Sequence, residues 1–144
     1  MNALEIARTG LDVEWRRLEV ITENLANVNT VSKGRPYRMR SLLSGPSADF
    51  ASYLDHKEPA GGVDVQSLAG VTIYGVQEDN TPPHLVYEPG NPQANADGFV
   101  AYPAIDHAGQ MTLMIKTSRA YEADIVAMNA ARQMYSKALE LGRR

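Results

Sequence analysis

The chain has 144 residues, no cysteine, and 14 basic against 17 acidic side chains, which gives a formal net charge of −3. A near-balanced charge without a basic patch among aromatic residues argues against a nucleic-acid binder. The lack of cysteine excludes disulfides, thiol catalysis and Cys-based metal sites. No run approaches the ~18–20 apolar residues of a membrane span, so we expect no direct membrane insertion. Charged residues also interrupt the N-terminus where a signal peptide needs an apolar stretch.

The first predicted element is a helix over residues 3–27, which Asn2 can cap. Its apolar residues recur every seven positions, in one unbroken row and in a second row that Glu14 interrupts. The first row is Leu4, Leu11, Leu18 and Leu25, and the second is Ala7, Ile21 and Val28. This spacing is typical of a helix that packs along its length against other helices.

The segment from residue 31 to 103 differs in character, because Gly and Pro become frequent and short β-like runs stand between them. Those runs cover residues 63–65, 71–77, 84–88 and 99–102. We expect a small β-rich middle domain over residues 31–105, with a mobile loop near 44–62. Together with the terminal helices, this predicts an α+β fold.

The last predicted helix begins after Asp106, a plausible N-cap, and runs to about Leu141 within a C-terminal segment of residues 106–144. Its main apolar stripe comprises Met111, Met114, Ser118, Tyr121, Ile125, Met128, Tyr135 and Leu139, and a second row comprises Leu113, Ala120, Ala127, Met134 and Leu141. A helix that is apolar nearly all round must be surrounded. The excess favours contacts with neighbouring subunits, although a helical hairpin inside an ordinary α+β domain stays open.

Enzyme motifs are weak. The histidines, His56, His84 and His107, lie far apart, and none has the helical spacing of a zinc motif. His56 and Glu58 could bind a metal in a small enzyme built on the 55–107 region, but solvated or structural histidines fit better. We find no phosphate-binding glycine loop or nucleophile elbow, so we predict no catalytic residue, metal site or cofactor.

Three asparagines lie within six residues at the end of the first helix: Asn24, Asn27 and Asn29. Asparagine is a poor helix former that pairs readily with backbone groups. The three residues could simply end the helix. They could also form hydrogen bonds with a neighbouring chain where the helix becomes a loop.

At this point the sequence resembles a known family. Residues 18–30 are similar to the asparagine-rich N-terminal motif of bacterial flagellar rod, hook and related axial proteins, and Thr9-Gly10-Leu11 matches that family's small-Gly-apolar step. Four further segments, and the short chain length, resemble proximal-rod members in particular. These segments are residues 87–92, 98–103, 114–123 and 128–132.

The resemblance implies a structural subunit that is delivered by the flagellar type III export apparatus without a cleaved signal peptide. It implies self-assembly with other rod subunits into a helical tube across the periplasm, which transmits torque, encloses the export channel and supports motility. Residues 1–30 and 106–144 would form the wall, and 31–105 would lie outside it. A cytosolic oligomeric coiled-coil adaptor is the alternative.

The assembly interface predicted from the stripes and the resemblance draws on both terminal segments. It comprises Leu4, Leu11, Leu18, Ile21, Asn24, Leu25, Asn27, Val28, Asn29, Met114, Ser118, Arg119, Tyr121, Ile125, Met128, Asn129, Tyr135 and Leu139. The three asparagines are expected to satisfy backbone groups of an adjacent subunit.

Overall fold

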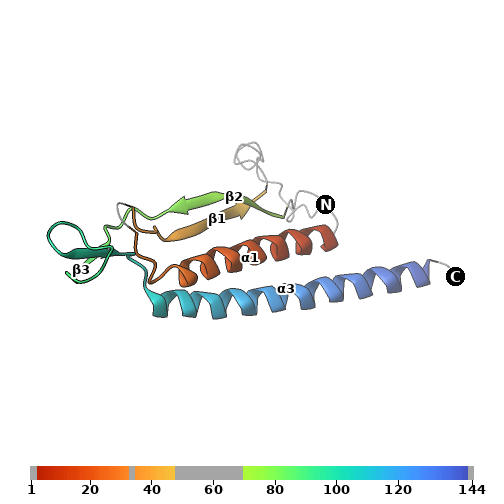
Figure 1. The fold of residues 1–144 in the computed structure, drawn as a ribbon. Coiled ribbons are helices and arrows are strands. Elements are labelled where there is room, and N and C mark those ends of the chain that lie inside the picture. Colours follow the sequence, from red (N-terminus) through yellow and green to blue (C-terminus); the bar gives the residue numbers. More distant parts are fainter. Residues whose placement is uncertain (1–2, 33–34, 48–69, 143–144) are drawn as a thin grey trace. The chain divides into compact units, whose positions relative to one another are not determined.

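The computed structural model describes residues 3–32, 35–47 and 70–142, which form two long helices and two small antiparallel sheets (Figure 1). This arrangement confirms the α+β class. The elements are α1 (Ala3–Ala26), β1 (Arg40–Pro46), β2 (Val71–Glu78), β3 (His84–Tyr87), β4 (Phe99–Tyr102) and α3 (His107–Leu141).

Both helices begin and end close to the predicted residues. α1 ends where the amide of Asn27 is shared between the carbonyls of Glu23 and Asn24, at 3.2 Å from each. α3 starts directly after Asp106, and a Cβ at Gly109 would lie 2.5 Å from Oδ2 of that aspartate. Glycine therefore leaves room for the Asp106 side chain over the first turn.

β1 pairs with β2, and hydrogen bonds close both ends of the pair. The amide of Ser47 donates to the carbonyl of Gly70 at 3.0 Å, and that of Asp79 donates to Met39 at 2.8 Å. β1 was not predicted, and its last residues fall at the start of the predicted 44–62 loop. The remainder of that loop from residue 48, and the run at 63–65, lie outside the described residues.

β3 and β4 form the second sheet, and both strands were predicted. Their antiparallel register pairs His84 with Tyr102 and Tyr87 with Phe99. The strands are four residues each. Such a short two-stranded sheet has little stability alone, so its attachment to the rest of the chain matters.

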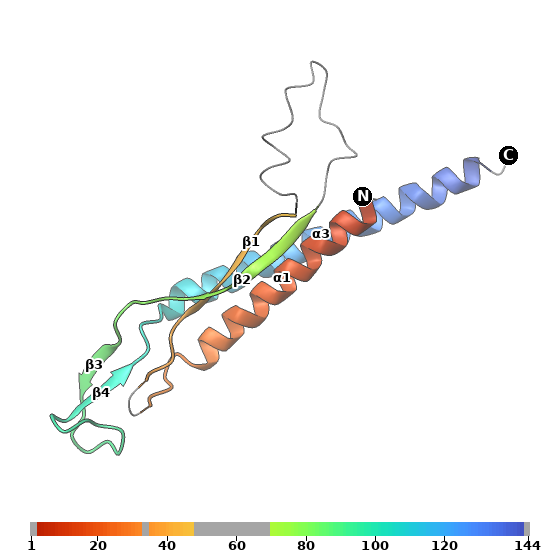
Figure 2. The same cartoon turned by 90° about the horizontal axis from the view of Figure 1, so that it is seen from above.

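The chain divides into two compact units, each of which combines parts of both helices with part of the middle segment. One unit comprises Met1–Trp15, Ser44–Tyr74 and Ser118–Arg144, and the other comprises Arg16–Leu43 and Gly75–Thr117. Within each unit, a piece of α1 packs beside a piece of α3 that runs in the opposite direction (Figure 1 and Figure 2). The proposed independence of residues 31–105 as a domain stays a prediction.

In the first of these units, the Thr9-Gly10 pair brings other elements close to α1. The hydroxyl of Thr9 donates to the carbonyl of Ile6 at 2.7 Å and accepts the amide of Val71, the first residue of β2, at 3.1 Å. A Cβ at Gly10 would lie 3.1 Å from Oδ2 of Asp124 on α3. The small residue therefore permits a close approach of the two helices.

The buried positions of α1 differ from the predicted leucine row. Val13, Val20 and Ile21 are 4%, 2% and 2% exposed, whereas the four predicted leucines are half-buried. β-branched residues also recur every seven positions in the unbroken row Ile6, Val13 and Val20. That second periodicity marks the centre of the packed face, and the leucines flank it.

Candidate assembly site

The most buried polar side chain in the described residues is that of Asn24, which is 1% exposed. A primary amide can donate two hydrogen bonds and accept two. The Asn24 amide nitrogen donates to the carbonyl of Arg40 at 2.8 Å and to Oε1 of Gln110 at 3.0 Å. Its oxygen accepts the amide of Arg40 and the hydroxyl of Tyr37, both at 2.9 Å. The side chain therefore uses its full hydrogen-bonding capacity.

This network joins α1, β1 and α3 inside one unit. Asn24 bonds both backbone groups of Arg40, as a neighbouring strand would, and so caps the edge of β1 that faces away from β2. Gln110, in the first turn of α3, is 9% exposed, and its amide nitrogen lies 3.5 Å from the sulfur of Met39. Asn24 thus makes its hydrogen bonds within the chain, and its predicted contact with an adjacent subunit stays a prediction.

The other two asparagines are used differently. The Asn27 amide nitrogen donates to the Glu23 carbonyl at 2.8 Å, which satisfies a carbonyl at the end of α1. Asn29 is exposed. Their predicted role at a subunit contact stays a prediction.

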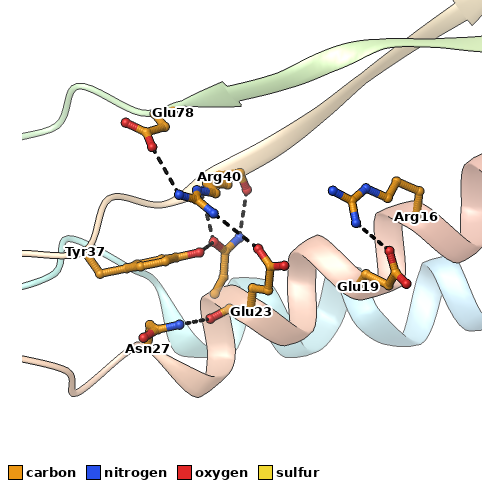
Figure 3. Close-up of polar contacts among 8 residues, drawn as sticks. Arg16, Glu19, Glu23, Asn27, Tyr37, Arg40 and Glu78 are labelled. Carbon is orange, nitrogen blue, oxygen red and sulfur yellow. Dashed lines mark hydrogen bonds and ion pairs between the residues drawn. The ribbon is translucent and has the colours of Figure 1, made fainter.

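Arg40 also lies at the centre of a charged cluster over the same region (Figure 3). Its guanidinium lies 3.5 Å from Glu23 and 3.4 Å from Glu78, and 5.6 Å from the centre of the Tyr37 ring. These side chains are about half exposed, so each ion pair contributes only ~0–1 kcal/mol. Burial raises the pKa of the Tyr37 phenol above its ordinary value, against the opposing influence of Arg40; Glu23 and Glu78 raise it further. Tyr37 therefore remains a hydrogen-bond donor to Asn24 at neutral pH.

The predicted α3 stripe is half-buried in its middle and exposed at both ends. Ser118, Tyr121, Ile125 and Met128 are half-buried, whereas Met114, Arg119, Asn129, Tyr135 and Leu139 are exposed. The Tyr121 ring lies 6.1 Å from that of Trp15 on α1. On α1, Ile21 is buried, and Val28 beyond its end is half-buried.

The packed side of α3 is polar. Its buried residues are Gln110 and Thr117, seven positions apart, and Asp124 and Ala131 continue that row as half-buried residues. Several large apolar side chains of α3 lie outside this row and are exposed. Exposed fractions are 55% for Ile115, 67% for Val126 and 66% for Met134. Sequence reasoning missed this side because it followed apolar residues, although the seven-residue row of small and polar residues is visible in the sequence.

The end of α3 is the most exposed helical segment. Every described residue after Ala131, from Arg132 to Gly142, is exposed. α3 has 35 residues and α1 has 24, so α1 is too short to accompany all of α3 when the two run antiparallel. Tyr135 and Leu139 are each 55% exposed, and Leu141 is 75% exposed. These residues have the apolar character of a packed helix, yet within the described part of the chain they remain largely exposed.

Features that would indicate chemistry are few. Within the described ranges, no three His, Asp or Glu side chains gather as a metal ligand set would require. His84 and His107 are exposed, and His56 and Glu58 lie outside the described residues. In the same part of the chain, neither helix has the length and apolarity needed to cross a bilayer.

Comparison with known proteins identifies both ends of the chain. A family profile described as flagella basal body rod protein matches residues 4–31, and one described as flagellar basal body rod FlgEFG protein C-terminal matches residues 96–141. The chain is 36% identical to the flagellar basal-body rod protein FlgC of Salmonella typhimurium, over 99% of this chain and 97% of the relative. It is 32% identical to FlgC of Bacillus subtilis, with the same coverage.

Paired terminal helices and matches at both termini define an axial structural protein of the bacterial flagellum. More narrowly, the chain belongs to the FlgC family of flagellar basal-body rod proteins. Members of this family are structural subunits of the rod and not enzymes. The predicted family, structural role and lack of catalysis are thereby confirmed.

Proposed function

We propose that this chain assembles with copies of itself and with other rod subunits into the helical tube of the proximal rod. The observation that carries the proposal is the exposed apolar surface of α3, whose side facing α1 is polar. Val126, Met134 and Leu141 are 67%, 66% and 75% exposed. Large apolar side chains exposed in this number along one helix indicate a protein–protein contact.

The residues of the predicted interface are consistent with this proposal, and only Asn24 is given a different role. Leu4, Leu11, Leu18 and Leu25 are half-buried at the margin of the packed face of α1, where another helix can cover them. Tyr135 and Leu139 extend the exposed surface of α3. Asn24, by contrast, stabilises the subunit itself, so its contribution to assembly is to hold α1, β1 and α3 in place.

Delivery and location follow from the same proposal. We infer that the chain passes through the flagellar type III export apparatus and joins the rod in the periplasm. There it would transmit torque and enclose the export channel. A secretion assay in cells with and without a functional export gate tests this step. If the chain stays in the cytosol whether or not the gate is functional, the adaptor alternative would be favoured.

The assembly step is tested by Met134→Asp, with Ser136→Asp as a matched control that adds the same charge two residues away. Both side chains are exposed, so the purified variants should unfold at the same urea concentration as the parent chain. In cells that lack their own copy, we expect Met134→Asp to be secreted without forming rods, and Ser136→Asp to restore swimming. Normal rods from Met134→Asp would contradict the proposal that this surface is used.

A further inference from the structure

The β3–β4 hairpin presents a second apolar surface, on a different element from α3. Residues directly opposite each other in an antiparallel pair share one face. The register therefore places Leu85 with Ala101 and Tyr87 with Phe99 on the same side. Leu85 and Tyr87 are 63% and 64% exposed, and the rings of Tyr87 and Phe99 meet edge to face at 5.3 Å. These four residues are called the outer face of the hairpin.

The opposite side of the hairpin is packed at Val100, whereas its partner Val86 is 42% exposed. Val100, between Phe99 and Ala101, points the other way and is 1% exposed. The outer face is the more exposed side, since three of its four residues are exposed. A hollow beside it is lined by Leu85, Ala94 and Phe99.

The loop that joins β3 to β4 holds this face in a fixed shape. Oδ1 of Asn95 accepts the amides of Asp97 at 3.0 Å and Phe99 at 2.9 Å. The amide of Glu88 donates to the carbonyl of Gly98 at 2.9 Å, and Gly98 has a φ of 81°. A surface held by such bonds loses little conformational freedom on binding, which favours recognition.

The end of α3 matches the outer face in polarity and in charge. Met134, Ala138 and Leu141 stand at i, i+4 and i+7, the spacing by which a helix lays one apolar stripe into a groove. The segment 132–144 carries Arg132, Lys137, Arg143 and Arg144 against Glu140, a net of 4 − 1 = +3. The segment 84–102 has no Lys or Arg, and its acidic residues are Glu88 and Asp97.

We propose that the outer face of the hairpin binds the end of α3 from a second copy of this chain, an inference that rests on the proposed function above. The contact joins two different surfaces, so it is heterologous, and the pair of copies still has one free hairpin face and one free helix end. Such a contact propagates along an open assembly. The opposite charges of the two segments orient the approach.

Cysteine cross-linking tests the contact directly, because the chain has no cysteine of its own. Cells would express two copies, one with Leu85→Cys and one with Ala138→Cys, and their basal bodies would be oxidised. We expect a disulfide-linked dimer that contains both variants. Thr81→Cys, at an exposed position before β3, replaces Leu85→Cys as the matched control and should give no dimer. Maleimide labelling of the unassembled chains confirms that all three thiols are reactive.

A second measurement adds Asp97→Lys to the Leu85→Cys copy, and we expect a several-fold lower dimer yield at low salt. Adding Lys137→Asp to the Ala138→Cys copy should restore it. Absence of the mixed dimer from rods that contain both variants would overturn the inference, as would a Leu85→Cys cross-link to a different protein. Those outcomes leave the proposed function intact. Rods that lack the chain altogether would refute the function itself.

Discussion

Replacement of Asn24 by alanine removes four hydrogen bonds from a side chain that is 1% exposed. Each buried group that loses its partner costs ~1–3 kcal/mol. Arg40 and Tyr37 are half-buried, so water can replace part of the loss, and we expect a total near ~2–4 kcal/mol. This is a large part of the ~5–15 kcal/mol that stabilises a typical domain. For a chain of this size it corresponds to a fall of about 10 °C in melting temperature.

The assay is thermal and urea unfolding of the purified chain, with Asn27→Ala as the control. Asn27 bonds a helix carbonyl at the margin of α1, so its removal should cost less than ~1 kcal/mol. The double variant of Asn24 and Gln110 should lose less than the sum of the single variants, because both changes break the same bond. An Asn24→Ala chain that melts like the parent but fails to form rods would refute the claim that Asn24 stabilises the single subunit. It would indicate instead that Asn24 contacts another subunit.

Three further predictions concern other parts of the chain. Gly98→Ala should accelerate hydrogen exchange in the β3–β4 hairpin, because a Cβ there lies 2.9 Å from the Tyr87 ring at a φ of 81°; unchanged exchange would contradict this account. The raised pKa of Tyr37 means that its contribution to stability is complete below about pH 10, the value for an unfolded chain, and is lost as the pH rises through the folded pKa. In urea unfolding, raising the pH above about 10 should therefore lower the free energy of unfolding less in Tyr37→Phe than in the parent chain. Limited trypsin digestion should cut first after Arg132 and Lys137, in the exposed end of α3, and a first cut within α1 would argue against its packing.

The helices could be predicted closely because their periodicity extends over many turns. Asn2, Asp106 and the asparagines after residue 23 also provide start and stop signals. β2, β3 and β4 followed from β-branched and aromatic runs between turn residues. β1 could not be predicted, because Gly45 and Pro46 resemble a loop. Its strand conformation depends on pairing with β2 and on the amide of Asn24, both contacts with residues distant in sequence.

The candidate site shows the same limit. The asparagine-rich segment stood out in the sequence, yet nothing local indicates that Asn24 meets Arg40 and Gln110, which lie 16 and 86 positions away. The packed face was displaced from the predicted leucines for a related reason. Hydrophobic periodicity assumes that the most apolar row is the most buried, whereas here Gln110 and Thr117 occupy the buried positions of α3.

The polar packed side and apolar open side of α3 give folding and assembly different responses to temperature. Apolar surface that is removed from water lowers the heat capacity, and in this chain much of that surface, including Val126 and Met134, is still exposed in the single subunit. Much of the drop in heat capacity should therefore accompany incorporation into the rod and not folding of the subunit. Because hydrophobic association weakens on cooling, subunits should add less readily to growing rods in the cold while each subunit stays folded.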